Sequence, residues 1–319
     1  MSSISYCCPY FVGAEFFLLL TSSIDGSGGQ STTPIRVRVV ELFPFTQSQT
    51  MKVAVLEHAE LPPIVILKLY DRRYLEERGP GGKSKAIWSH EKEREAAETD
   101  REYDRTSALV TTTAEEEVDL DCEEEDGYES DISEIEFAYQ IASADAPVTQ
   151  WLIEERFRHR TSDWYHAETK AYERLQHFQQ WCLPRFFGSV EFDQTRLRDM
   201  ALGIHTEVRG IFLEFIDGIT VDKIPAGSPL TLAYPTDGND VVRCFTQINA
   251  AGVIHGDLRL ENLILRDGRI FIVDFAHAKF RNPQDSDDRW NRRISYEREP
   301  SAISDFIGRV FPPALVTGI

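Results

Sequence analysis

The stretch Val253-Ile-His-Gly-Asp-Leu-Arg-Leu-Glu-Asn262, followed twelve residues later by Asp274-Phe-Ala276, carries most of the information in this chain. Asp257 and Asn262 are five residues apart on what reads as a tight loop after a helix. Two short apolar segments, 263–266 and 269–273, flank Asp267-Gly268, which is a strong signal for a type I′ β-hairpin turn. The hairpin predicts that Asn262, just before its first strand, lies beside Asp274, just after its second.

An amide and a carboxylate at one hairpin mouth, next to a loop carboxylate, form a set of oxygen ligands. Mg²⁺ prefers such ligands, and a nearby carboxylate can orient a hydroxyl group. The pattern therefore predicts that Asn262 and Asp274 bind Mg²⁺ and that Asp257 is the catalytic base. The alternative is that the spacing arises by chance and that Asp267-Gly268 is only a turn.

These motifs resemble the catalytic-loop and magnesium-binding signatures of the protein-kinase-like superfamily. His-Gly-Asp stands where His-Arg-Asp is usual, as in the aminoglycoside and choline kinase branches and several atypical protein kinases, and Ala276 stands where Gly is usual. The resemblance implies an α+β, bilobal fold with a small antiparallel-sheet N-lobe and a reduced, mainly helical C-lobe. It also implies ATP and Mg²⁺ as cofactors.

Lys68 lies in the apolar segment 63–70, the third of three strands predicted at 35–43, 50–57 and 63–70. Burying an ammonium group costs free energy unless the group is paired. The resemblance implies that Lys68 is the strand lysine that holds the α- and β-phosphates of the nucleotide. The alternative is a side chain that reaches out into water from an edge strand.

Helical periodicity resumes at Trp151 and is clear at 163–180, where a helix is predicted, and Glu168 lies on its apolar face. That face consists of Trp164, Tyr165, Ala171, Tyr172, Leu175 and Phe178. A carboxylate on a buried face requires a cation. The segment resembles the C-helix of the family, which implies that Glu168 is the ion-pair partner of Lys68. The alternative is a glutamate at the rim that binds water or Arg174.

The segment 211–218 resembles the linker between the two lobes, although by itself it is only an apolar strand that ends in a turn. The resemblance implies an adenine site on this linker and on the two segments that flank it. Its residues are Leu213 as gatekeeper, Glu214 and Ile216 through their backbone, and Ile66 and Ile264 on the two faces of the base.

The chain departs from the family pattern at three places. The turn 43–50 contains no glycine, so the hydroxyl and amide groups of Thr46, Gln47 and Ser48 are the candidates for phosphate contacts. Gly256 removes the arginine that usually reads a phosphorylated activation loop, and no Ala-Pro-Glu motif follows. We therefore expect no regulation by activation-loop phosphorylation. His255 is interpreted as bracing the loop.

The expected organisation has three parts. Residues 1–33 are predicted to be a disordered leader and linker, 34–216 the N-lobe and hinge, and 217–319 a reduced C-lobe with helices near 237–251 and 302–311. The charged region 75–146 is predicted to be a disordered insertion, because its acidic run cannot bury enough apolar surface. It is interpreted as a solvated loop, with binding of a basic partner as the alternative.

Composition excludes several classes of protein. The net charge is −19, but the window 111–136 holds thirteen acidic residues and no Lys or Arg, so the remainder carries only −6, which does not suggest a nucleic-acid surface. Five cysteines without metal spacing favour a reducing compartment. The apolar run 10–20 is too short to span a membrane, carries Glu15 and lacks a basic flank. We expect an intracellular protein, cytoplasmic or nuclear.

Taken together, the motifs predict an ATP- and Mg²⁺-dependent phosphotransferase that transfers the γ-phosphate to a hydroxyl acceptor. A Ser or Thr of a protein is favoured as the acceptor, and a small molecule, as in the aminoglycoside and choline kinases, is one alternative. The other is a pseudokinase that acts as an interaction module. The missing glycine-rich loop and Ala276 favour that second alternative.

Overall fold

This computed structural model describes residues 9–23, 30–44, 46–58, 60–78, 88–89, 91–92, 147–192, 208–224 and 239–297. Most of the predicted insertion at 75–146 and the predicted helix at 302–311 lie outside the described residues. The same holds for the thirteen-acid window and for residues 1–8 and 24–29 of the predicted leader.

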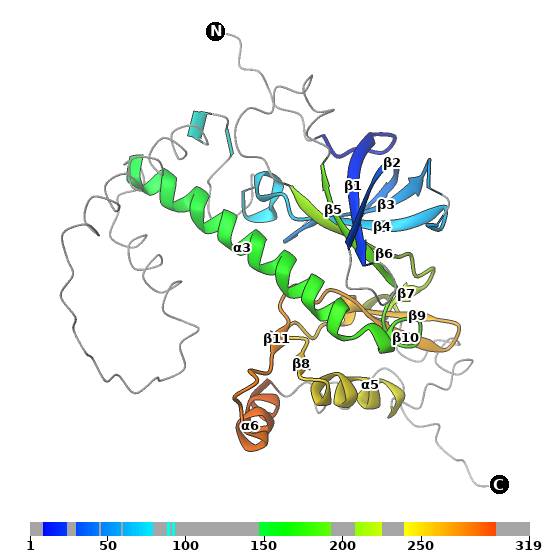
Figure 1. The fold of residues 1–319 in the computed structure, drawn as a ribbon, viewed down its shortest axis with the longest axis vertical. Coiled ribbons are helices and arrows are strands. Elements are labelled where there is room, and N and C mark those ends of the chain that lie inside the picture. Colours follow the sequence, from blue (N-terminus) through cyan, green and yellow to red (C-terminus); the bar gives the residue numbers. More distant parts are fainter. Residues whose placement is uncertain are drawn as a thin grey trace.

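Six antiparallel strands close into a barrel, drawn from blue to green in Figure 1. They are β1 (Glu15–Ser23), β2 (Gln30–Leu42), β3 (Gln49–Val55), β4 (Ile64–Leu69), β5 (Phe186–Phe192) and β6 (Arg209–Glu214). Their order around the barrel is β1-β2-β3-β4-β6-β5, and β5 pairs back to β1. The predicted antiparallel meander of three strands is confirmed as β2, β3 and β4.

The barrel interior explains how a lysine can lie inside an apolar strand. Side chains alternate between the two faces of a strand, so Val65, Leu67 and Leu69 of β4 point into the barrel and are fully buried there. Lys68 therefore lies on the outer face. That face is not exposed to water, because it packs toward a long helix.

The N-terminal segment corrects the prediction of a disordered leader at 1–33. Residues 15–23 form β1, and Phe16, Leu18 and Leu20 fill the barrel. Glu15, which counted against a membrane span, points outward, where Arg36 and Arg38 each donate a 2.9 Å hydrogen bond to it from Nε. The apolar run is too short for a membrane, but in β1 its side chains alternate between the barrel interior and the outer face, and the strand closes the barrel by pairing with β5.

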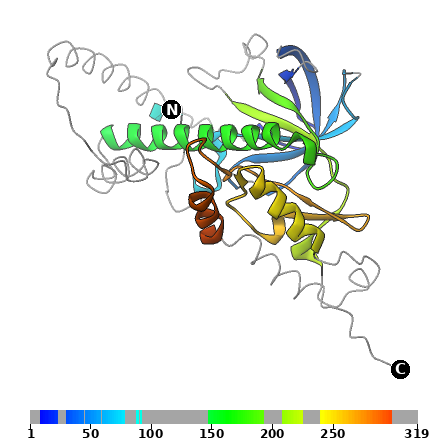
Figure 2. The same cartoon turned by 60° about the horizontal axis from the view of Figure 1, so that its bottom comes forward.

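The helix α3 (Pro147–Arg174) lies between the barrel and the remaining elements, and the two views in Figures 1 and 2 agree on this. It begins at Pro147, close to Trp151, where helical periodicity resumes in the sequence, and is followed by the short turn η3 (Gln176–Phe178). Two further turns, η1 (Arg72–Tyr74) and η2 (Glu76–Arg78), follow β4. Arg78 makes a buried, bidentate ion pair with Glu154 of α3 at 2.8 and 2.7 Å. Residues 75–78, predicted to belong to the disordered insertion, are thus packed against α3.

The elements that follow β6 carry the two motifs at 253–262 and 274–276. They are β7 (Ile219–Thr220), η5 (Val221–Lys223), α5 (Asn239–Ala250), β8 (Val253–Ile254), η6 (Leu260–Asn262), β9 (Leu263–Arg266), β10 (Arg269–Ile272), β11 (Lys279–Phe280) and α6 (Asp287–Glu297). The predicted helix at 237–251 corresponds to α5, whereas α6 was not predicted. Within the part of the chain that the structure describes, no helix is long and apolar enough to cross a membrane.

One hydrophobic core joins these parts. Ala171, Tyr172 and Leu175 of α3 pack with Ile211 and Leu213 of β6, and the same cluster includes residues of α5 and of the β9–β10 hairpin. The C-terminal half of α3 is therefore held from both sides. This fixes the helix, and with it Glu168, relative to both the barrel and the hairpin.

Candidate active site

The predicted pairing between the strand lysine and the helix carboxylate is present. Lys68 Nζ lies 2.6 Å from Glu168 Oε2 and 2.7 Å from Asp274 Oδ1. The Lys68 side chain is 6% exposed and that of Glu168 is fully buried, so the alternatives of a lysine reaching into water and a glutamate at the rim are both wrong. Asp274 is 29% exposed and faces solvent with part of its carboxylate.

Glu168 connects three elements through its two carboxylate oxygens. Oε2 accepts from Lys68 and from the hydroxyl of Tyr70, while Oε1 accepts from the backbone N–H of Phe275 at 3.3 Å. Lys68 and Tyr70 are two residues apart on one strand, so they share a face. The carboxylate thus ties β4 and the segment after β10 to α3.

Burial and charge act against each other at these groups. Burial alone would lower the pKa of Lys68, but the carboxylates of Asp274 and Glu168 beside it raise that pKa above its ordinary value. Burial likewise favours a raised pKa for Asp274, yet Lys68 holds it below its usual range. For Glu168, burial raises the pKa and Lys68 opposes the rise. Lys68 therefore stays charged, and Asp274 stays ionised, at neutral pH.

The β9–β10 hairpin joins the two predicted metal ligands. Asp267 and Gly268 both have positive φ, at 50° and 75°, as a type I′ turn requires. The backbone N–H of Val273 donates to the carbonyl of Asn262 at 3.0 Å, which closes the hairpin mouth as predicted. Asn262 and Asp274 are therefore held at adjacent ends of the two paired strands.

The loop between β8 and η6 presents Asp257. Asn262 Nδ2 donates to the backbone carbonyl of Asp257 at 2.9 Å and to its Oδ2 at 3.3 Å. His255 donates from Nε2 to the carbonyl of Val273 at 2.9 Å and accepts at Nδ1 from the N–H of Asp257 at 3.3 Å. Since a carbonyl can only accept, these two bonds require the neutral Nε2–H form. His255 braces the loop, as interpreted from the sequence.

Arg259 is a site residue that the sequence patterns did not single out. Its guanidinium contacts Asp257 Oδ2, with Nε at 3.1 Å, and this contact raises the pKa of Arg259. The arginine is 57% exposed, while Asp257 is 18% exposed. Its position in the sequence, two residues after Asp257, is the signal from which this contact could have been predicted. The predicted base is therefore partly covered by a guanidinium group instead of standing open to a hydroxyl.

Gly256 packs directly against the segment that follows Asp274. A β-carbon at Gly256 would lie 2.1 Å from the carbonyl oxygen of His277, and the glycine has φ +78°. No side chain, least of all arginine, fits at this position. The His-Gly-Asp spelling therefore has a steric cause here: residues 275–277 occupy the space beside the loop.

A column of aromatic rings supports the site from behind. Phe186 stacks on Tyr172 with ring centroids 5.8 Å apart, Tyr172 meets the edge of Phe275 at 5.5 Å, and Phe275 lies 4.7 Å from the ring of His255. These contacts run from β5 through α3 to the two loops. They make the positions of Glu168, Asp274 and Asp257 interdependent.

The predicted adenine-site residues lie on neighbouring elements. Ile66 of β4 pairs with Leu213 of β6, Ile216 is buried just beyond β6, and Ile264 of β9 pairs with Thr220 of β7. The carboxylate of Glu214 is already engaged by the N–H of Arg185 at 3.1 Å and by Arg266 at 3.2 Å. Only the Ile66 and Leu213 pair is brought into direct register, and the adenine site stays a prediction.

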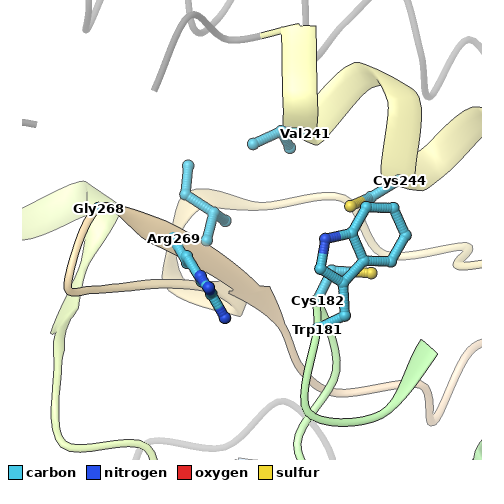
Figure 3. A pocket seen from close by; sticks show the side chains of 7 residues that line it. Trp181, Cys182, Val241, Cys244, Gly268 and Arg269 are labelled. Carbon is cyan, nitrogen blue, oxygen red and sulfur yellow. The ribbon is translucent and has the colours of Figure 1, made fainter. Parts of the chain in front are cut away.

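A separate pocket of about 130 Å³ lies between α5 and the turn of the hairpin (Figure 3). None of the predicted site residues lines it; its walls include Trp181, Arg269 and the thiols of Cys182 and Cys244. A hydrogen bond to Cys244, together with burial, raises the pKa of Cys182 well above its usual range. The thiol is therefore protonated at neutral pH and is a poor nucleophile. Packing is the role that these two cysteines support.

Comparison with known proteins gives partial matches. No family model matches the chain. The KEOPS complex subunit Bud32 of Pyrococcus abyssi is 32% identical over 74 residues, which are 22% of this chain and 31% of that protein. The probable serine/threonine-protein kinase BUD32 homolog of Archaeoglobus fulgidus is 35% identical over 66 residues, 21% of this chain and 34% of that protein. The chain thus spans about a third of the length of these relatives, and the similarity supports a kinase-like function in general terms.

Proposed function

We propose that this chain is an ATP- and Mg²⁺-dependent phosphotransferase built on a bilobal protein-kinase-like fold. The observation that carries the proposal is the contact of Lys68 with Glu168 and Asp274, at 2.6 and 2.7 Å, across sequence separations of 100 and 206 residues. Buried charges cost free energy unless they serve pairing or function. A lysine held between two carboxylates supplies a positive charge for phosphate, and the partly exposed carboxylate of Asp274 supplies a ligand for a metal ion.

The oxygen donors fit Mg²⁺. Asn262 uses Nδ2 for its two hydrogen bonds, which leaves Oδ1 for a cation. Asp274 accepts from Lys68 at Oδ1 and also from the backbone N–H of Ala276, and the lone pairs of its two carboxylate oxygens allow a cation to bind as well. Two hard oxygen ligands, completed by phosphate oxygens and water, match the preference of Mg²⁺. When bound, Mg²⁺ supplies charge neutralisation at the phosphate oxygens.

Each residue then has a role in positioning. Lys68, oriented by Glu168, holds the α- and β-phosphates, and Asp257 accepts the proton of the acceptor hydroxyl. The adenine lies against Ile66, Leu213 and Ile264, with backbone groups of Glu214 and Ile216 as its hydrogen-bonding partners. Catalysis rests on alignment and charge stabilisation, because phosphoryl transfer asks little covalent chemistry of the protein.

The acceptor is a hydroxyl group. A Ser or Thr of a protein is favoured over a small molecule, since the Archaeoglobus relative is named as a serine/threonine-protein kinase homolog. A pseudokinase is the second candidate, and the contact between Arg259 and Asp257 favours it, because the guanidinium occupies Oδ2, one of the two carboxylate oxygens that could accept the proton.

Turnover separates the two candidates. The experiment measures ADP release and phosphate incorporation with MgATP and a panel of peptides and small alcohols, for the wild type and Asp257→Asn. An active enzyme predicts a loss of about 10²- to 10⁴-fold in Asp257→Asn with MgATP affinity retained. Binding of MgATP without transfer to any acceptor or to water, in both proteins alike, would favour the pseudokinase.

A further inference from the structure

The loop between β2 and β3 lies at the Lys68 end of the sheet. Thr50, the second residue of β3, pairs with Lys68, so the preceding residues sit directly beside the proposed phosphate site. The loop has a rigid base: Gln49 is buried, accepts from the N–H of Asp71 at 2.9 Å and donates to the carbonyl of Tyr74 at 3.2 Å.

Of the three polar side chains proposed from sequence for phosphate contacts, the structure distinguishes one. Ser48 is buried, and its hydroxyl lies 3.3 Å from that of Thr50. Thr46 is exposed and is held through its carbonyl, which accepts from the N–H of Glu76 at 3.1 Å. Gln47 instead reaches across to the segment after Asp274, where His277 Nε2 lies 2.9 Å from its Oε1.

His277 places this contact at the reacting end of the site. Its carbonyl packs against Gly256, next to the predicted base, and its ring meets Trp164 of α3 at 6.0 Å. The charged groups that act on the half-buried imidazole are Asp257, Asp274, Lys68 and Arg259. These are the groups between which the terminal phosphate has to lie if the proposed function holds.

The hydrogen bond leaves a donor free to turn toward a ligand. A carboxamide oxygen only accepts, so His277 donates from Nε2 and Gln47 keeps both N–H groups of its amide. Amide N–H groups are donors for phosphate oxygens, and such bonds are strengthened because the oxygen is charged, while the bond from His277 holds the Gln47 amide in place.

We propose that Gln47 and His277 form a side-chain clamp for the terminal phosphate of the nucleotide. This inference rests on the proposed function and adds to it. Gln47 lies on a loop without glycine, and His277 lies on the segment after Asp274. Together they cover the phosphate, a task that backbone N–H groups of a glycine-rich loop perform in other nucleotide sites. Because the clamp meets only the last phosphate, it distinguishes ATP from ADP.

The test is the ratio of affinities for MgATP and MgADP, measured by calorimetry on the full chain. Asp257→Asn serves as the background so that ATP is not consumed. The variants are Gln47→Ala, His277→Ala and both together. The matched control is the exposed neighbouring pair Gln176→Ala and His177→Ala, which changes the same residue types away from the site.

The clamp predicts that the background protein prefers ATP and that each single variant lowers the preference about tenfold, with ADP affinity kept. The double variant loses little more, since the two side chains act as one unit. The control pair keeps the full preference. If His277→Ala does not fold, as judged by its unfolding transition, Gln47→Ala alone decides.

The negative outcomes separate the two proposals. Binding of both nucleotides with an unchanged preference in the variants, or with no preference in the background protein, overturns the clamp and leaves the proposed function standing. Absence of binding of either nucleotide in the background and control proteins overturns both.

Discussion

The backbone carbonyl of His277 packs so closely against Gly256 that a β-carbon added to the glycine would lie only 2.1 Å from the carbonyl oxygen. The segment after Asp274 is thus pressed against the loop that carries Asp257. The motif that contains Asp257 and the segment that follows Asp274 are therefore in direct steric contact. Substitutions at Gly256 therefore test whether this contact holds the site together.

Gly256→Ala is expected to destabilise the protein by about 2 kcal/mol or more, because the new methyl group collides with backbone and the residue has positive φ. Gly13→Ala is the matched control: Gly13 has φ +93° but no atom within 4 Å of the β-carbon position. It should cost about 1–2 kcal/mol from backbone strain alone. Urea unfolding measures both. Equal losses would show that the space beside Gly256 is open.

Lys68→Met is expected to cost about 3–5 kcal/mol of folding stability, because it leaves the buried carboxylate of Glu168 and the partly exposed one of Asp274 without their cation. Lys52→Met on the adjacent strand, where the ammonium lies over the ring of Phe215, should cost about 1 kcal/mol or less. The comparison is made by denaturant unfolding. A loss at Lys68 no larger than at Lys52 would contradict the buried ion-pair assignment. Loss of activity in Lys68→Met has to be judged against this instability.

Tyr70→Phe is expected to cost about 1–3 kcal/mol, since it removes a hydrogen bond to the buried carboxylate of Glu168. Tyr172→Phe offers a matched control on the same core. The hydroxyl of Tyr172 is buried and, among the described residues, has no hydrogen-bond partner, so its removal should be neutral or stabilising. Thermal and urea unfolding of the two variants should move in different directions. Similar losses would indicate that both hydroxyls serve packing only.

His277 is expected to make stability depend on pH. Burial lowers its pKa below the ordinary value of 6.5, although Asp257 and Asp274 oppose the shift and Lys68 and Arg259 reinforce it. Between the two pKa values the unfolded chain binds more protons, so stability is present above about pH 6.5 and is lost as the pH falls. As the pH is lowered below about 6.5, the stability of the wild type should fall more than that of His277→Gln. A matching decline in both proteins would remove His277 as the cause.

The contacts between residues of the candidate site were predicted from the sequence better than the elements that surround the site. Lys68 and Glu168 could be found because a charge on an apolar face requires a partner, and the hairpin could be found because Asp267-Gly268 specifies its turn. These are local rules. The roles of the residues in catalysis stay predictions, as does the bilobal kinase-like fold.

The errors arose where pairing is nonlocal. Strand β1 was interpreted as part of a leader because its apolar run shows no alternation in sequence, and its inner and outer faces are defined only once β2 and β5 are placed on either side. The first part of α3, where the periodicity from Trp151 is less clear, contains Glu154, and its partner Arg78 lies at the edge of the insertion, 76 positions away. Gln47 and His277 are 230 positions apart, and no sequence pattern connects them.

The most direct test of the central claim is the thermal stability of the protein with ATP and Mg²⁺, each alone and together, for the wild type and Asp274→Asn. If Lys68, Asn262 and Asp274 form a MgATP site, millimolar MgATP raises the unfolding temperature of the wild type by several degrees, since a ligand at a hundred times its Kd adds about 2.7 kcal/mol. Asp274→Asn loses the part that depends on Mg²⁺. An unfolding temperature that is unchanged by millimolar MgATP in the wild type would contradict the account.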